Sequence, residues 1–386
     1  MERLEATMPA PEPTIPQDPL TLAIAAHERA IALRGETRLP EAERECRRAL
    51  ELYEQVEGPE SADVANASFE LAQILQERDQ AREARVAFAR AREILGPPAE
   101  DADVDADVAR LSIQALTGAA GIDRQLGAYE DAERGFRAAL AETERVFGPD
   151  DLDVASLLNN LGVLRKYQAR FDEAVVFYER ALPMLEAHAK ETGETGALAT
   201  LYHNLGGIEH ARGRYAAGEP HARRSIEMRE AELGPDHVSV AADVAALAGL
   251  VEGLGRFDEA AALYERAIDT FTRKLGPESA EVALDLSGLA SVRQAQGRVP
   301  EARALYERAL ALQEKVFGRE HPEVAMTLNN FAALEREHGD RARARTLYES
   351  AWKTYQTVVG DEHEYTRLCL ENLRAVEAEL PPKPRR

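Results

Sequence analysis

A repeat of about 42 residues runs along most of the chain and constrains the fold more than any other feature of the sequence. In the clearest copies, at 171–182, 257–268 and 299–310, a small residue is followed four positions later by a bulky one and seven positions later by another small one. Spacings of four and three place the three side chains on one face of a helix. The first small residue recurs at Ala42, Ala84, Ala132, Ala174, Gly218, Ala260, Ala302 and Ala344. Such a period predicts similar helical units stacked side by side.

Another small residue lies twelve positions upstream in six of the copies, directly after Leu or Phe. It is found at Ala72, Gly162, Gly206, Ala248, Ala290 and Ala332. Each copy is therefore interpreted as two helices, the first and second helix of a repeat, which approach closely where both carry small residues. Gly-Pro pairs at 148–149, 234–235 and 276–277 end the second helix, because Gly readily closes a helix and Pro cannot continue one.

The composition agrees with a helical array and narrows the class of partner. Hydrophobic residues make up 45% of the chain but aromatic residues only 6%, so the core must be built mainly from Ala, Leu and Val, which suits closely packed helices. Acidic side chains number 69 against 47 basic ones, which gives a net charge of −22. This charge disfavours nucleic acid and anionic membrane surfaces as partners, because both require a basic face.

Cysteine usage and the N-terminal segment predict a cytoplasmic protein. The two cysteines, Cys46 and Cys369, lie near opposite ends of the chain, so neither a disulfide framework nor a cysteine zinc cluster is expected. Residues 1–20 lack the basic start and apolar stretch of a signal peptide, and no apolar run is long enough to cross a membrane. The oligomeric state is left open.

Three segments, at 234–268, 277–310 and 321–351, share the repeat pattern almost from end to end. In these residues the chain resembles tetratricopeptide repeats (TPRs) of the kinesin light chain type, which are longer than the general unit of about 34 residues. The resemblance spans roughly residues 18–360. It implies an all-α fold: a right-handed α-solenoid superhelix of about eight hairpins plus a C-terminal capping helix, with the first helices lining a concave groove. The high content of Ala, Arg and Glu favours a bacterial source.

The repeats and their interruptions predict the following organisation. The segments are a flexible Pro-rich arm (1–18), repeats one and two (19–98), repeat three with an acidic insertion (99–150), regular repeats four to eight (151–360), a capping helix (361–380) and a basic tail (381–386).

No constellation of catalytic, cofactor-binding or metal-binding residues stands out, so we expect neither an enzyme nor a cofactor. The sequence GLGRFD at 253–258 half-matches a dinucleotide fingerprint, but it falls at a repeat turn. The acidic run Asp101, Asp103, Asp105 and Asp107 lacks the Gly and the final acid of a calcium loop, and is interpreted as a solvated linker. Three histidines recur at one phase of the inter-repeat turn and are expected to be structural, namely His237, His321 and His363.

Polar residues recur on the first helices just before their core Leu or Phe. Asn occupies one phase at Asn160, Asn204, Asn330 and Asn372, although Asn is a poor helix former. Two explanations remain open: the amides bond to neighbouring repeats, or they bind the backbone of an extended peptide, as the kinesin light chain resemblance implies. The predicted partner-binding residues are Asn159, Asn160, Lys166, His203, Asn204, His210, Asn329, Asn330 and Arg336.

This polar series is interrupted in repeats six and seven by a floor of small residues. The equivalent positions there are Ala245, Ala246, Ser287 and Gly288. Such a floor has room for a bulky apolar side chain or a helix, so the acidic peptides bound by members of the family need not be the ligands of this chain.

The sequence therefore predicts a non-enzymatic scaffold that binds a peptide or helical segment of another protein in the concave groove. The alternative is a regulatory sensor subunit that changes curvature when a peptide binds and thereby controls a partner enzyme. The interrupted third repeat and the fifth repeat, whose second helix carries the small residues Gly218 and Ser225, would provide its hinge.

Overall fold

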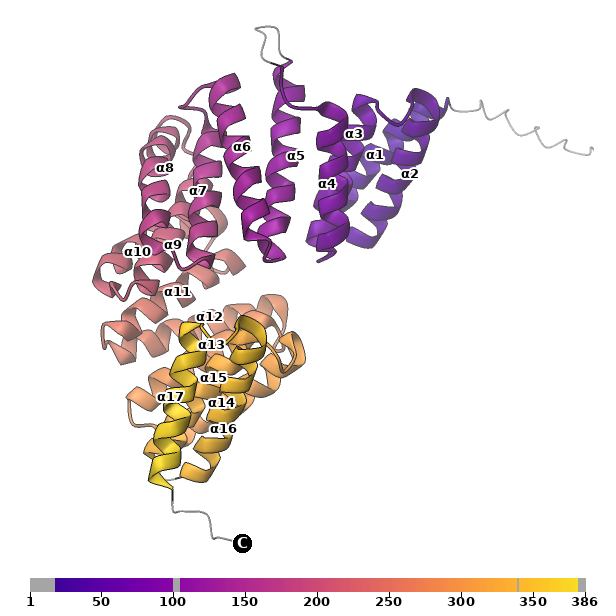
Figure 1. Cartoon of the computed structure of the whole chain (residues 1–386). Coiled ribbons are helices and arrows are strands. Elements are labelled where there is room, and N and C mark those ends of the chain that lie inside the picture. The colour runs from indigo at the N-terminus through magenta and orange to yellow at the C-terminus, as the bar shows by residue number, and fades with distance from the viewer. Residues whose placement is uncertain (1–17, 100–104, 339, 381–386) are drawn as a thin grey trace, which may run out of the picture. The chain divides into compact units, whose positions relative to one another are not determined.

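The structure is a computed structural model that describes residues 18–99, 105–338 and 340–380, and all regular secondary structure in these ranges is α-helical (Figure 1). The chain divides into two compact units, Met1–Ala169 and Arg170–Arg386. The predicted basic tail and nearly all of the predicted Pro-rich arm lie outside the described residues.

The first unit contains three helical hairpins and one further helix. Its helices are α1 (Pro19–Gly35), α2 (Leu39–Glu57), α3 (Ala62–Glu77), α4 (Ala81–Leu95), α5 (Ala106–Gln125), α6 (Tyr129–Phe147) and α7 (Leu152–Tyr167). Helices α1 and α2, α3 and α4, and α5 and α6 pack as pairs, and each pair packs against the next element along the chain. Of the acidic run, Asp101 and Asp103 lie outside the described residues. Asp105 caps the start of α5, where its side chain accepts a bond from the backbone N–H of Asp107 at 3.0 Å.

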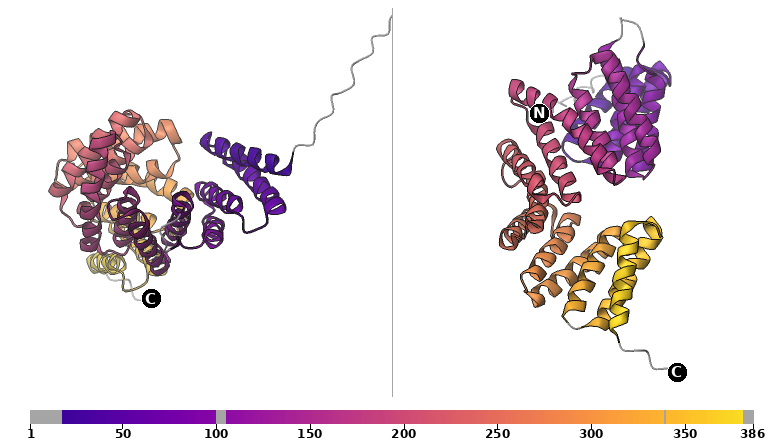
Figure 2. Two further views of the ribbon diagram at one scale, coloured as in Figure 1. Left: turned by 90° about the horizontal axis from the view of Figure 1, so that it is seen from above. Right: turned by 60° about the vertical axis from the view of Figure 1, so that its left-hand side comes forward.

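The second unit contains one helix, four hairpins and a closing helix (Figure 2). Its helices are α8 (Phe171–Thr192), α9 (Gly196–Ala211), α10 (Tyr215–Leu233), α11 (Val238–Gly253), α12 (Phe257–Leu275), α13 (Ala280–Ala295), α14 (Val299–Phe317), α15 (Pro322–Glu337), α16 (Arg341–Val359) and α17 (Glu364–Glu379). The prediction of an all-helical chain of paired helices is confirmed. By register, α7 and α8 are the two helices of the fourth repeat.

The three periodic histidines are structural, as predicted. Each precedes the first residue of a helix, and its Nδ1 accepts a bond from the backbone N–H two residues later. The distances are 3.1 Å at His237, 3.2 Å at His321 and 3.3 Å at His363. These contacts satisfy N–H groups that have no partner within the first turn of a helix. The GLGRFD segment is the turn between α11 and α12, where Gly255 adopts a φ of +75°.

The core is built from the small and bulky positions of the repeat. In α14, Ala302, Tyr306 and Ala309 are almost completely buried. The Tyr306 ring stacks on Phe331 of the next hairpin, with 5.4 Å between ring centroids. The alanines let helices approach closely, and the aromatic ring fills the remaining space between successive hairpins.

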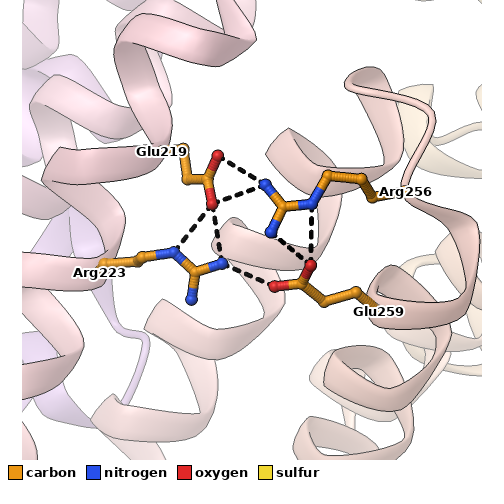
Figure 3. Close-up of polar contacts among 4 residues, drawn as sticks. All are labelled: Glu219, Arg223, Arg256 and Glu259. Atoms are coloured by element: carbon orange, nitrogen blue, oxygen red, sulfur yellow. Dashed lines mark hydrogen bonds and ion pairs between the residues drawn. The ribbon is translucent and has the colours of Figure 1, made fainter.

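In the second unit, the first helices α9, α11, α13 and α15 contact one another directly across successive hairpins. They therefore form the inner side of this stack. Between the second helices α10 and α12, Arg223 of α10 donates a bond to Glu259 of α12 at 2.6 Å, and Arg256, which directly precedes α12, donates to both oxygens of Glu219 at 2.8 Å (Figure 3). This ring of four charges ties two repeats together but stays accessible to solvent, so it contributes little to stability.

Candidate functional site

A cavity of about 530 Å³ lies on the inner side of the second unit. It is lined by side chains from the four first helices α9, α11, α13 and α15, together with residues of α10, α12 and α14. Ala245, Ser287 and Gly288 are among its lining residues. The cavity thus lies over the floor of small residues that interrupts the polar series.

One glycine makes room for an aromatic side chain beside the cavity, and a second glycine lies close to a histidine ring. A Cβ atom on Gly288 would lie only 2.5 Å from Cζ of Tyr264, so the ring occupies the space that any other residue would fill. At Gly249 a Cβ atom would lie 3.3 Å from Nε2 of His210 and 3.6 Å from the Tyr264 hydroxyl. Burial raises the pKa of Tyr264 well above its usual range, so the hydroxyl stays protonated and is available as a donor.

Three carboxyl groups line the cavity, those of Glu252, Asp285 and Glu323. Glu252 accepts a bond from Ser291 Oγ at 2.6 Å and lies 3.5 Å from the Tyr264 hydroxyl. Burial raises the pKa of Glu252 above its ordinary value despite these bonds. Burial also raises the pKa of Glu323, although the neighbouring His321 opposes this effect. The cavity is therefore lined by acidic groups whose charged forms are disfavoured by burial.

A polar pair joins successive first helices at a fixed register in the second unit. His203 Nδ1 lies 2.7 Å from Asp243, Ser287 Oγ lies 2.9 Å from Thr327 Oγ1, and Cys369 Sγ lies 3.5 Å from Asn329 Oδ1. Each pair spans 40 residues. Positions 203, 287 and 329 are equivalent in their repeats, and so are positions 243, 327 and 369. These contacts hold one first helix in register with the next.

At the remaining step, between α11 and α13, the pair is incomplete. The equivalent positions are Ala245 and Asp285, and an alanine side chain cannot form a hydrogen bond. Asp285 is only 8% exposed, and no described residue donates a hydrogen bond to its Oδ2 atom. Burial raises the pKa of Asp285 to about 7, and the charge of Glu281 adds to this shift.

The surroundings of the two aspartates differ on the second helices as well. Asp243 accepts a bond from Ser225 Oγ at 2.5 Å and lies 3.5 Å from Nε of Arg229. One repeat later the equivalent positions hold Ala267 and Phe271, both buried and apolar. Asp243 therefore has a full set of partners within the protein, whereas Asp285 lacks all three equivalents.

Three of the predicted partner-binding residues bond to neighbouring repeats instead of facing solvent freely. His203 bonds to Asp243, as described above. Asn329 Oδ1 accepts a bond from Asn372 Nδ2 at 3.0 Å. Arg336 donates two bonds to Glu379 of α17, at 3.0 Å and 2.5 Å. Two explanations were given for the polar series, bonds to neighbouring repeats and binding of a peptide backbone. These contacts are of the first kind.

The other predicted residues are distributed over both units. His210 and Asn330 line the cavity, and the His210 ring lies edge-on to Tyr215 with 5.4 Å between centroids. Asn204 lies on α9. On α7 of the first unit lie Asn159, Asn160 and Lys166. Burial lowers the pKa of Lys166.

Sequence reasoning did not single out Asp285, Gln313 or Glu323. The signal that identifies Asp285 is a comparison of equivalent positions: Asp243 and Asp285 are 42 residues apart, whereas His203 is replaced by Ala245. In the sequence, Ala245 stands out only as part of the floor of small residues. Ala245 matters because it cannot form with Asp285 the bond that His203 forms with Asp243.

Neither a metal site nor a membrane span is found in the part of the chain that the structure describes. No three His, Cys, Asp or Glu side chains in it are grouped closely enough to hold a metal ion. None of the described helices combines the length and the apolar character needed to cross a bilayer.

The chain is similar to several known proteins. A TPR repeat-containing protein from Dictyostelium discoideum is 25% identical over 192 residues, or 48% of this chain and 11% of that protein, so the chain spans about a tenth of this relative's length. BtubC (BKLC) from P. vanneervenii is 19% identical, with 71% of this chain and 96% of that chain covered and a TM-score of 0.43. A Rap protein complexed with Competence and Sporulation Factor is 12% identical, with 92% and 98% covered and a TM-score of 0.56. The likeness to the Rap protein shows a shared fold.

The family of the chain follows from the extent of one match. The tetratricopeptide repeat family matches residues 21–95, 111–187, 197–273 and 281–357, which together exceed half of the chain. Such repeats generally serve protein–protein interaction. The paired helices, the repeat period and this match lead to one conclusion: the chain belongs to the tetratricopeptide repeat family.

Proposed function

We propose that the protein is a non-enzymatic scaffold that binds a peptide or helical segment of a partner protein along the inner side of its second unit. The observation that carries this proposal is the cavity of about 530 Å³, which is lined by four successive first helices. A site spread over several repeats suits an extended ligand, because each repeat contributes a short stretch of one continuous surface. The Rap protein of similar fold was crystallised with Competence and Sporulation Factor, and we extend ligand binding, but not the identity of the ligand, to this chain.

The proposed contact residues in the second unit are His210 and Asn330, which line the cavity, and Asn204 on α9. An Asn amide both donates and accepts, which matches the two needs of a peptide backbone. His203, Asn329 and Arg336 act in this proposal by holding the first helices in register. Asn159, Asn160 and Lys166 provide corresponding polar positions in the first unit.

The test is selection of binding peptides from a random phage library on the full chain, followed by fluorescence anisotropy with a selected peptide. Ala245→Trp fills the cavity and should weaken binding by roughly tenfold or more, which corresponds to about 1.4 kcal/mol. The matched control is Ala262→Trp, which places the same side chain at an exposed position of α12. Circular dichroism confirms that both variants fold. Failure to select any peptide, or equal affinity of the wild type and the folded Ala245→Trp variant, would contradict the proposal.

The alternative, a regulatory subunit, is favoured by one observation. The chain divides into two compact units between Ala169 and Arg170, inside the fourth repeat. Small-angle scattering with and without a selected peptide tests this role. A radius of gyration that stays constant on binding would eliminate the regulatory alternative and leave the scaffold.

A further inference from the structure

The cavity of the second unit contains hydrogen-bond acceptors that no donor among the described residues satisfies. Asp285 Oδ2 and Gln313 Oε1 are both buried, and neither has a hydrogen-bond partner among the described residues. Gln313 is fully buried, and its Nε2 donates to the carbonyl oxygen of Ala283 at 3.2 Å, which fixes the orientation of the amide. A buried acceptor without a donor costs free energy, so an external donor is favoured at this place.

The repeat register indicates that the missing partner is a cation. At the equivalent position one repeat earlier, Asp243 is surrounded by His203, Ser225 and Arg229. At Asp285 these positions hold side chains that can neither donate a hydrogen bond nor carry a positive charge. The smaller side chain at Ala245 contributes to the lining of the cavity in which Asp285 lies. The same substitution that removes the internal partner also provides space for an external one.

The other charges of the cavity exclude the remaining ligand classes. Glu252 and Glu323 line the same cavity as Asp285, so an anionic group would be repelled and a purely apolar one would leave buried carboxylates without compensation. A metal ion is disfavoured, because among the described residues no three potential ligands are grouped closely enough to coordinate one. An organic cation with several N–H donors at the end of a flexible chain satisfies separated acceptors better than a single ion does.

We propose that the cavity receives the ammonium or guanidinium group of a lysine or arginine side chain of the bound peptide, with Asp285 as its counter-ion. This inference rests on the proposed peptide-binding function and specifies its ligand: a segment with a basic residue at the position over α13. Glu323, which lines the same cavity, adds negative charge around this cation. The floor of small residues accommodates the aliphatic part of the side chain.

The test uses an array of peptides with random flanks and one fixed central residue, which is arginine, lysine, citrulline, norleucine, glutamine or glutamate. The full wild-type chain should bind the arginine or lysine peptides roughly tenfold better than the citrulline and norleucine peptides, because only the former carry charge and donors together. Citrulline keeps the shape of arginine without its charge, so this comparison isolates the electrostatic contribution.

Three variants assign the preference to the cavity. Asp285→Asn should abolish the preference for a basic central residue. Asp269→Asn, which removes the same charge from an exposed position of α12, should leave it unchanged. Ala245→His places an imidazole where His203 lies in the preceding repeat, and should abolish the preference while the melting temperature stays at or above that of the wild type.

The outcomes separate this inference from the function on which it rests. Binding of the array by the wild type without a preference for basic residues, or an unchanged preference in Asp285→Asn, would overturn the inference but not peptide binding. If no arrayed peptide binds, the proposed function fails as well. Arginine amide and spermidine are then tested by thermal shift, and a stabilisation that requires Asp285 would assign the cavity to a free amine instead of a peptide.

Discussion

At the scale of single residues, Asp243 and Asp285 show how strongly the neighbours of a carboxylate decide its role. Both occupy the same position of a first helix, 42 residues apart. One is bonded to His203 at 2.7 Å, and the other faces Ala245 at the equivalent place. A buried carboxylate without a partner destabilises the fold when it ionises. Asp285 is therefore unfavourable for stability, but it is available to the proposed cation.

The first prediction concerns the pH dependence of this cost. The pKa of Asp285 is raised from 3.8 to about 7 in the folded state. Below pH 3.8 the Asp285 carboxyl is protonated in both the folded and the unfolded state. As the pH rises towards 7, the unfolded state loses this proton first, so the free energy of unfolding declines. Above about pH 7 both states are ionised, and the loss of stability is complete. Asp285→Asn should therefore change the free energy of unfolding little near about pH 4, and raise it by up to roughly 4 kcal/mol near about pH 8.

Urea unfolding at the two pH values measures this effect, with Asp269→Asn as the matched exposed control. Two other carboxyl groups of the cavity, Glu252 on α11 and Glu323 on α15, also have raised pKa values, and Glu281 adds its charge on the same helix as Asp285. The difference between variant and wild type removes their common contribution. A gain of equal size at both pH values would contradict the raised pKa.

The second prediction concerns the partners of Asp243. Ser225 Oγ lies 2.5 Å from Asp243 Oδ2 and 2.9 Å from the carbonyl oxygen of Ala199. Ser225→Ala leaves the buried carboxylate with one donor fewer and should lower the free energy of unfolding by about 1.5–3 kcal/mol. Ser350→Ala removes an exposed hydroxyl from α16 and should change it by less than about 0.5 kcal/mol. Equal effects in denaturant unfolding would show that the Ser225 contact is not stabilising.

The sequence predicts residue roles well only where they depend on local structure. The helix-capping histidines were predicted because their phase relative to the turn is visible in the chain itself. The partners of Asn329 and Arg336 were not, because each lies 43 residues away, on the next first helix. The site at Asp285 is even harder to predict from the sequence, since neither Ala245 nor Asp285 is unusual by itself.

At the scale of elements, α17 covers the inner and terminal face of the last hairpin. Leu373 and Val376 of α17 are buried against Ala332 and Tyr348. Glu379 accepts bonds from Arg336 and Arg341. These contacts lead us to expect that α17 caps the apolar face of this hairpin, as the terminal elements of stacked arrays do.

The third prediction tests this capping role. Leu373→Ala should create a cavity and destabilise the contact by about 2–3 kcal/mol. Because each repeat contacts only its neighbours, the loss should be local. Hydrogen exchange should accelerate in α15, α16 and α17 but not in α9 to α11, and Leu368→Ala, at a 42% exposed position of the same helix, should have little effect. Acceleration spread evenly over the second unit would contradict a local cap.

The fourth prediction concerns the ring of four charges on α10 and α12 (Figure 3). Glu219 accepts bonds from both Arg223 and Arg256, but the two arginines are nearly half exposed. Glu219→Gln should lower the melting temperature slightly at low salt, and the difference should vanish at about 1 M NaCl, where exposed charges are screened. The shift caused by Ser225→Ala should persist at high salt. A shift from Glu219→Gln that also persists would show that the ring is effectively buried.

The helices themselves were largely predictable, because a period of 3.6 residues and the breakers at their ends are local signals. The repeat spacing likewise predicted which helices pair. What the spacing cannot show is the exact register between one first helix and the next, since this depends on side chains far apart in the chain. The polar pairs at 40 residues emerge only when the hairpins are packed.

At the scale of the whole molecule, the net charge of −22 favours positively charged ligands before any contact forms. The fifth prediction follows from it. The association rate of a peptide with a central lysine should fall by roughly tenfold between about 50 mM and 500 mM NaCl, because salt screens long-range attraction. A peptide with central norleucine and neutral flanks serves as the control in stopped-flow measurements. Equal salt dependence of both peptides would contradict electrostatic steering.

The position of the boundary between the two units was not predicted from the sequence, in which the pattern is interrupted in the third repeat. It falls between α7 and α8, one repeat after the acidic insertion that interrupts the pattern. The periodic residues continue through this point without a break, at Gly162 and Ala174. Sequence periodicity reports what each repeat contributes to its own core, and it does not mark where the chain divides into compact units.

The incomplete pair at Ala245 and Asp285 has a consequence for how such arrays acquire new ligands. When a repeat is duplicated, both halves of each inter-repeat contact are copied together. A later loss of one half leaves the other half in place, already desolvated and held by a rigid helix. Recognition in a repeat protein can thus arise by subtraction: the loss of internal donors turns a structural contact into a receptor, and their return closes it again.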